Sequence, residues 1–120
     1  MKILGIGVDI VENSRIAKSI KNNLFIKRIF SSSEILNAKK IKDKENYYAK
    51  RFAAKEAFAK SVGMGIRNEL NFKDIIIIND KLGKPFFLVN EKLKKIVKKQ
   101  FKTSSFNFFL SISDEKKYSI

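Results

Sequence analysis

The chain has 120 residues with 26 Lys and Arg against 12 Asp and Glu, a net charge of +14, and neither Cys nor His. This length predicts one domain, residues 1–120, with a core of its own. The missing residue types exclude disulfides, thiolate metal sites and imidazole catalysis, so acid–base chemistry falls to Asp, Glu, Lys or Tyr. Any metal ion should be hard and oxygen-bound, such as Mg²⁺ or Mn²⁺.

The composition also sets expectations about location and partners. No apolar run is long enough to span a membrane, and the N-terminus lacks the features of a signal peptide, so we expect a cytoplasmic protein. The positive charge predicts an acidic partner: nucleic acid, an anionic membrane, a phosphate-rich ligand or an acidic protein. Only four of the 26 basic residues are Arg, and a general bias towards Lys, Asn and Ile produces the same balance. The charge therefore permits an acidic partner without identifying it.

The first stretch, GIGVDIVE at 5–12, alternates like a strand, and we predict a strand over residues 2–11. The face predicted to enter the core consists of Leu4, Ile6, Val8 and Ile10. The opposite face has two glycines followed by Asp9. An exposed edge or a turn explains Asp9 simply. Alternatively, the glycines leave room for a group to approach the backbone, and Asp9 meets it.

Short helices are predicted next. NSRIAKSIKNN reads as a helix capped by Asn13 or Ser14. Arg15 lies in its first turn, where the helix dipole disfavours a cation, which indicates that Arg15 serves something outside the helix. SSSE at 31–34 predicts a capping box between Ser31 and Glu34 at the start of a third helical segment.

A long helix is predicted from Glu45 to Val62, ending at Gly63. It is apolar almost all round, which is typical of a central helix. Glu56 nevertheless lies among apolar neighbours, with Lys60 one turn further on. One interpretation is that Glu56 and Lys60 form an ion pair with each other. The other is a magnesium site made by Glu56 and Asp9 and completed by substrate phosphates. Arg51 and Lys55 are predicted to hold further phosphate.

The remaining elements follow from short patterns. IIII and FFLV flank the turn NDKLGKP and predict a hairpin over 72–89. NEKLKKIVKKQFK predicts an amphipathic surface helix. FNFFLSIS predicts a strand with Phe106, Phe108, Leu110 and Ile112 inward and Phe109 outward. KYSI predicts the start of another strand.

Four stretches, GIGVDIVE…RI, RFAAKEAFAKSVGMGI, LGKP and LSIS, resemble in order and spacing the holo-acyl-carrier-protein synthases. These form the small trimeric class of 4′-phosphopantetheinyl transferases. The resemblance covers essentially the whole chain. It implies an α+β fold with a small, mostly antiparallel sheet packed against a long central helix and shorter helices. It also implies magnesium-dependent transfer of 4′-phosphopantetheine from coenzyme A to a serine of apo-acyl carrier protein, which releases adenosine 3′,5′-bisphosphate.

The resemblance also implies roles for individual residues. Asp9 and Glu56 match magnesium ligands, and Lys60 matches the lysine that contacts the reacting phosphate; these three would be catalytic. Arg15 matches a basic residue that faces the acidic carrier protein. The positions that match the coenzyme A site, besides Lys60, are Arg51, Gly63, Gly65, Lys84 and Pro85. The resemblance further implies a homotrimer with coenzyme A sites between subunits, and we expect Phe109 at that interface.

Two features depart from the family pattern. Many members carry His where this chain has Asp114, and members usually continue several residues beyond the last predicted strand.

A basic nucleic-acid-binding module is the main alternative function. It explains the charge, but it does not explain Glu56 on an apolar arc, and no known DNA or RNA motif is present. A catalytically inactive relative is a second alternative, and the presence of Asp9, Glu56 and Lys60 argues against it. We therefore expect an enzyme that binds neither nucleic acid nor membrane.

Overall fold

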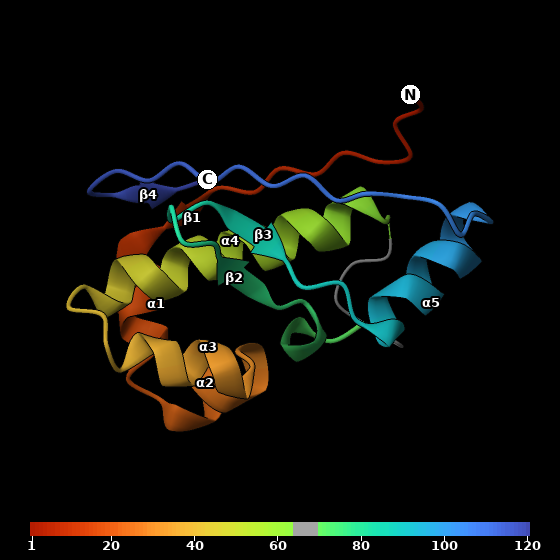
Figure 1. Ribbon diagram of the computed structural model, residues 1–120. Coiled ribbons are helices and arrows are strands. Elements are labelled where there is room, and N and C mark those ends of the chain that lie inside the picture. The colour runs from red at the N-terminus through yellow and green to blue at the C-terminus, as the bar shows by residue number, and fades with distance from the viewer. Residues whose placement is uncertain (64–69) are drawn as a thin grey trace.

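The computed structural model describes residues 1–63 and 70–120, and Figure 1 shows its elements arranged around one long helix. In chain order they are β1 (Val11–Glu12), α1 (Asn13–Ser19), α2 (Asn23–Ile29), α3 (Ser32–Ala38), α4 (Lys44–Ser61), the 3₁₀ turn η1 (Phe72–Asp74), β2 (Ile77–Asn79), β3 (Pro85–Phe87), α5 (Glu91–Phe101) and β4 (Tyr118–Ser119). The strands form two small antiparallel pairs, β1–β4 and β2–β3. The predicted α+β class is confirmed. Within the described residues, no helix is both long and apolar enough to cross a membrane.

Helix α4 is central, as its nearly continuous apolar surface predicts. It begins where the Asp43 side chain accepts a hydrogen bond from the Asn46 backbone N–H (3.0 Å), and it ends before Gly63, whose φ is +69°. The observed bounds differ from the predicted ones by one residue at each end. Helices α1–α3 gather near one end of α4, and α5 lies near the other (Figure 1).

Two apolar clusters use different stretches of α4. The first cluster packs Ala49 and Ala53 with side chains from α1, α2 and α3. The second packs Phe58 and Val62 with α5 and with strands β2 and β3. Alanines on α4 allow the surrounding backbones to approach closely, and the aromatic rings fill the space further out. Helix α4 therefore contributes side chains to both clusters, which pack on different stretches of it.

The N-terminal segment, residues 1–10, corrects the first prediction. It is extended, but strand pairing begins only at Val11, and the predicted core face points outward. The exposed fractions are 85% for Ile6, 67% for Val8 and 61% for Ile10. The glycine face is the one that packs on α4. A Cβ at Gly5 or at Gly7 would lie 1.9 Å from a helix carbonyl oxygen, so only glycine permits this contact. The glycines therefore make room for the helix itself.

The starts of the short helices are predicted correctly for α3 and wrongly for α1. Ser31 and Glu34 form the predicted capping box. Helix α1 has Glu12 at its N-cap with no side-chain cap bond. Asn13, one of the predicted caps, is buried and donates to the carbonyls of Glu115 (3.0 Å) and Lys116 (3.2 Å). Its side-chain oxygen, the group that caps a helix, accepts a hydrogen bond from Ser119 Oγ at 2.8 Å instead.

The hairpin and the C-terminal half follow the sequence patterns closely. Strand β2 pairs with β3 from Ile77–Phe87 to Asn79–Pro85, and the first residues of the predicted hairpin form η1 instead. Helix α5 and strand β4 occupy the predicted positions. Residues 106–112 are extended without strand pairing, and their inward side chains pack on the second cluster as predicted: Phe106, Phe108, Leu110 and Ile112. Phe109 is 84% exposed, as predicted.

Candidate active site

The close approach of the N-terminal segment brings Asp9 to Lys60 on α4. Lys60 Nζ lies 3.0 Å from Asp9 Oδ1 and also donates to the Val8 carbonyl oxygen at 3.1 Å. The Asp9 side chain is 16% exposed and that of Lys60 is 55% exposed. Lys60 therefore pairs with a residue 51 positions away in the chain, and not with Glu56 on its own helix. The lysine head remains open to solvent and to a ligand.

Glu56 is the second carboxylate at this place. Its side chain is half-buried, and burial is the main cause that raises its pKa. The negative charge of Asp9 raises this pKa further, while Lys60 lowers it. Two carboxylates that repel each other, one of them partly desolvated, are stabilised by a cation between them. Asp9 and Glu56 thus form a like-charge pair that the single Lys60 only partly compensates.

The two carboxylates fit a magnesium ion better than a fully protein-bound metal. In the described part of the chain, no group of three or more His, Cys, Asp and Glu could hold a metal. Mg²⁺ usually takes only one or two carboxylates, and water and phosphate oxygens complete its shell. The donor set of Asp9 and Glu56 suits such an ion, whose remaining ligands would be water and phosphate oxygens.

Arg51 is a buried cation with an unused donor. It is 7% exposed, its guanidinium lies 3.7 Å above the centre of the Tyr47 ring, and its Nη2 donates to Asn79 Oδ1 at 2.7 Å. Burial lowers the pKa of Arg51, and the neighbouring Tyr47 and Glu34 oppose this change. An arginine nevertheless stays charged. Its Nε has no hydrogen-bond partner. Arg51 is therefore held in place from two sides while part of its donor capacity is unsatisfied.

Lys55 contradicts its prediction as a phosphate ligand. Its side chain is fully buried, and its Nζ lies 2.7 Å from Glu34 Oε1. The periodicity of α4 places Lys55 on the helix but does not show what packs over it. The sequence explains Glu34 fully by the capping box with Ser31, so it does not indicate that this carboxylate also pairs with Lys55.

The other predicted site residues lie on different elements. Gly63 follows the C-terminal end of α4, and Gly65 falls outside the described residues. Pro85 opens β3, and the exposed Lys84 precedes it, its backbone N–H donating to Asp80 Oδ1 at 2.9 Å. Arg15 is exposed on α1.

Asp114, at the position where many family members have His, connects the C-terminal turn to α4. Its Oδ2 accepts a hydrogen bond from Asn46 Nδ2 at 2.7 Å. Asn46 lies in the first turn of α4. The acidic residue therefore has a structural partner on the helix that carries Arg51, Glu56 and Lys60.

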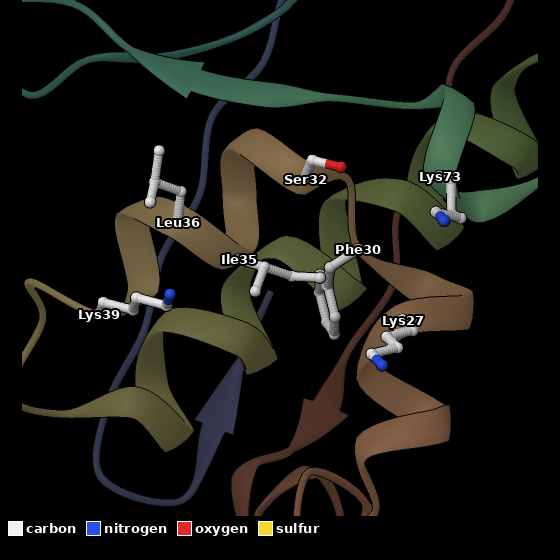
Figure 2. Close-up of a pocket in the computed structure, with 7 residues that line it drawn as sticks. All are labelled: Lys27, Phe30, Ser32, Ile35, Leu36, Lys39 and Lys73. Atoms are coloured by element: carbon white, nitrogen blue, oxygen red, sulfur yellow. The ribbon is translucent and has the colours of Figure 1, made fainter.

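A surface hollow of about 400 Å³ lies elsewhere, between α2, α3 and η1 (Figure 2). Its lining residues are Lys27, Phe30, Ser32, Ile35, Leu36, Lys39 and Lys73. None of these is a predicted site residue. Asp9 and Lys60 instead meet where the extended N-terminal segment rests on α4.

Comparison with known proteins identifies the family of the chain. The profile of the 4′-phosphopantetheinyl transferase superfamily matches residues 5–117. The chain therefore belongs to this superfamily. A holo-[acyl-carrier-protein] synthase of Pelagibacter ubique is 75% identical to it over 120 residues, which is 100% of this chain and 94% of that protein.

Solved structures give the same result. The crystal structure of holo-[acyl-carrier-protein] synthase from Neisseria meningitidis matches with a TM-score of 0.88 and 42% identity, covering 98% of this chain and 94% of that one. The Helicobacter pylori enzyme in complex with coenzyme A matches with a TM-score of 0.72 and 32% identity, covering 95% and 93%. The family and the fold expected from the sequence motifs are confirmed.

Proposed function

We propose that this chain transfers 4′-phosphopantetheine from coenzyme A to a serine of apo-acyl carrier protein. The observation that carries the proposal is the meeting of Asp9, Glu56 and Lys60 at the contact between the N-terminal segment and α4. The names of the relatives, and the complex of one of them with coenzyme A, support the same reaction.

The reaction is a displacement at phosphorus. The serine oxygen of the carrier forms a bond to the phosphorus that bears the pantetheine. The bond from that phosphorus to the bridging oxygen breaks, and adenosine 3′,5′-bisphosphate leaves with the electron pair. The serine proton passes to a carboxylate at the site or to water. Because negative charge builds up on the phosphate oxygens, cations fixed close to them accelerate the step.

The side chains divide this work by their positions. Asp9 and Glu56 would hold a magnesium ion, which neutralises the pyrophosphate and polarises the phosphorus when bound. Lys60, with its head half exposed, is able to turn from Asp9 to a phosphate oxygen and stabilise the leaving group. Arg51, with its unpaired Nε, supplies a second, immobile cation for the phosphates of coenzyme A. The coenzyme A site further includes Gly63, Gly65, Lys84 and Pro85.

The carrier protein would meet a different surface. Arg15 is exposed on α1, in the first turn, where the helix dipole disfavours it. A net charge of +14 attracts an acidic protein over long range. We therefore place carrier recognition around Arg15, and we place the reaction in the cytoplasm.

The same proposal includes a homotrimer. A single chain leaves several large apolar side chains exposed: Ile6, Val8 and Ile10 on the N-terminal segment, and Phe109. Exposed apolar surface of this kind is typical of an interface between subunits. Two neighbouring subunits would together form a cleft large enough for coenzyme A at the site. Light scattering at micromolar concentration tests this, and a monomer with full transfer activity would contradict the shared site.

The whole proposal is tested by incubating the chain with apo-carrier protein, coenzyme A and magnesium and weighing the carrier by intact-protein mass spectrometry. The expected result is a mass increase of one phosphopantetheine group that depends on both coenzyme A and the metal. A carrier in which the acceptor serine is replaced by Ala is the control. An unmodified wild-type carrier under these conditions would refute the function.

A further inference from the structure

Four segments of the chain meet at the buried ion pair between Lys55 and Glu34. Lys55 Nζ lies 2.7 Å from Glu34 Oε1, and both side chains have 0% exposure. An ammonium group has three donors. The other two donate to the backbone carbonyl oxygens of Phe72 (2.9 Å) and Ile75 (2.5 Å), which lie at the start of η1 and just after its end. All three donors are used, so Lys55 has none left for a substrate.

Glu34 extends these connections to α3 and β2. Its Oε1 also accepts the Ser31 backbone N–H at 2.9 Å, which fixes the start of α3. Its Oε2 accepts the backbone N–H of Ile77, the first residue of β2, at 3.1 Å. The pair therefore ties α3, α4, η1 and β2 together at a single point.

Strand β2 is tied to α4 a second time, one helical turn away. Asn79, the last residue of β2, accepts the hydrogen bond from Arg51, which precedes Lys55 by one turn. Asn79 also donates through Nδ2 to the Gly83 carbonyl oxygen in the hairpin turn at 2.9 Å, and it pairs with Pro85 across the hairpin. The hydrogen bond from the Ile77 N–H to Glu34 therefore fixes one end of β2 on the buried pair. Through Asn79 at the other end of β2, it also influences the position of the hairpin turn and of Arg51.

Stability alone explains this pair poorly. Burying two charges carries a large desolvation cost, and apolar replacements of similar volume are often neutral or stabilising. Apolar replacements, however, form no directional hydrogen bonds. They would bind neither the carbonyl oxygens of Phe72 and Ile75 nor the Ile77 N–H. The geometry of the pair therefore serves the relative placement of the hairpin and α4.

We propose that Lys55 and Glu34 are positioning residues for coenzyme A, which fix the β2–β3 hairpin on α4 and with it Arg51 and Lys84. This rests on the proposed function, which places the latter two at coenzyme A. Asp9 and Lys60 are held by a separate contact, between the N-terminal segment and α4. Loss of the buried pair therefore weakens coenzyme A binding and leaves the chemical step largely intact.

The test is the double variant Glu34→Gln/Lys55→Met, which removes both charges of the pair together, so that neither partner is left buried without the other. We expect the KM for coenzyme A to rise about tenfold with kcat changed less than about twofold, because an oriented cation is misplaced while the reacting groups are not. Hydrogen exchange at the Ile77 amide and along the hairpin should become faster. The matched control is Lys92→Met, which breaks an exposed 2.6 Å ion pair to Asp74 on the same η1 turn without touching α4. Its KM should stay at the wild-type value.

Three results would overturn the proposal: an unchanged KM in a folded double variant, a fall in kcat with no change in KM, or an equal rise of KM in the control. If the double variant does not fold, Glu34→Asp alone replaces it, since the shorter carboxylate keeps a counter-charge for Lys55 but loosens the hold on the Ile77 N–H. Faster exchange of the hairpin without a rise in KM would then contradict the proposal. Failure of the proposed function looks different, because the wild-type chain would then neither bind coenzyme A nor modify the carrier.

Discussion

Two of the lysines on helix α4, Lys55 and Lys60, each pair with a carboxylate from another segment. Lys55 and Glu34 are both 0% exposed at 2.7 Å, whereas Lys60 and Asp9 are 55% and 16% exposed at 3.0 Å. The buried lysine has all its donors committed to the protein, and the exposed one keeps its head in solvent. We therefore propose that the buried pair serves the architecture and the exposed pair serves the chemistry. Substitutions should separate the two roles.

The largest effect is expected for Lys55→Met. This change leaves Glu34 buried without its counter-charge, and breaking one side of such a pair costs about 3–5 kcal/mol in the free energy of unfolding. Urea denaturation followed by circular dichroism measures it. Lys92→Met, which breaks an exposed pair, should cost less than about 1 kcal/mol. Equal losses in the two variants would show that burial does not distinguish the pairs.

Asp9→Ala and Glu56→Ala come next, and they should act on activity instead of stability. If the two carboxylates share one divalent ion, each variant should lose roughly 10²–10³-fold in metal-dependent turnover, the size of removing one major electrostatic contribution. Their melting temperatures should stay near that of the wild type. Glu45→Ala, an exposed carboxylate on the same helix, is the control. Near wild-type turnover of either variant at limiting magnesium would mean that the ion is not shared.

A smaller loss is expected for Lys60→Ala. If Lys60 stabilises the charge that develops on the reacting phosphate, turnover should fall by roughly 10-fold to 100-fold, with a much smaller change in coenzyme A affinity. Steady-state kinetics and calorimetric titration of coenzyme A separate the two quantities. If turnover is unchanged and only KM rises, Lys60 is a binding residue. This result would make it resemble the role that we assign to Arg51.

The smallest effect concerns the surface around Arg15. Arg15→Glu should weaken carrier binding by about tenfold, with coenzyme A binding nearly unchanged. Because the attraction is between exposed charges, it should fall steeply above physiological salt, where the Debye length is ~8 Å. Lys98→Glu on α5 makes the same charge change far along the chain and should matter less. Carrier affinity that ignores both salt and charge reversal would rule out electrostatic recognition.

Local patterns in the sequence predicted most elements. The apolar surface of α4, the Ser31–Glu34 capping box, the hairpin signal and the amphipathic α5 each act within a few residues, so a single sequence reveals them. The faces of the N-terminal segment were assigned the wrong way round. Alternation defines two faces but does not say which one the protein covers. Gly5 and Gly7 mark the covered face, because the backbone of the segment approaches α4 at these two residues.

The candidate site was predicted in part. The family resemblance, Asp9 on the glycine face and Glu56 on an apolar arc point to Asp9, Glu56 and Lys60, and the pairing of Lys60 with Asp9 agrees with one shared place. Lys55 was wrongly assigned to phosphate binding, because its partner lies 21 positions away. Contacts of this kind depend on tertiary packing, which no local pattern encodes.

The pairing of β1 with β4 also has a consequence for the order of folding. Val11, two residues after Asp9, pairs with Ser119, near the opposite end of the chain. Closing so long a loop is slow in entropic terms, because non-local contacts must wait for the chain between them. In a refolding experiment, transfer activity should lag behind the recovery of helical circular dichroism, and simultaneous recovery would contradict this order. During synthesis, Val11, two residues after Asp9, therefore gains its strand partner Ser119 only after the whole chain between them has been made.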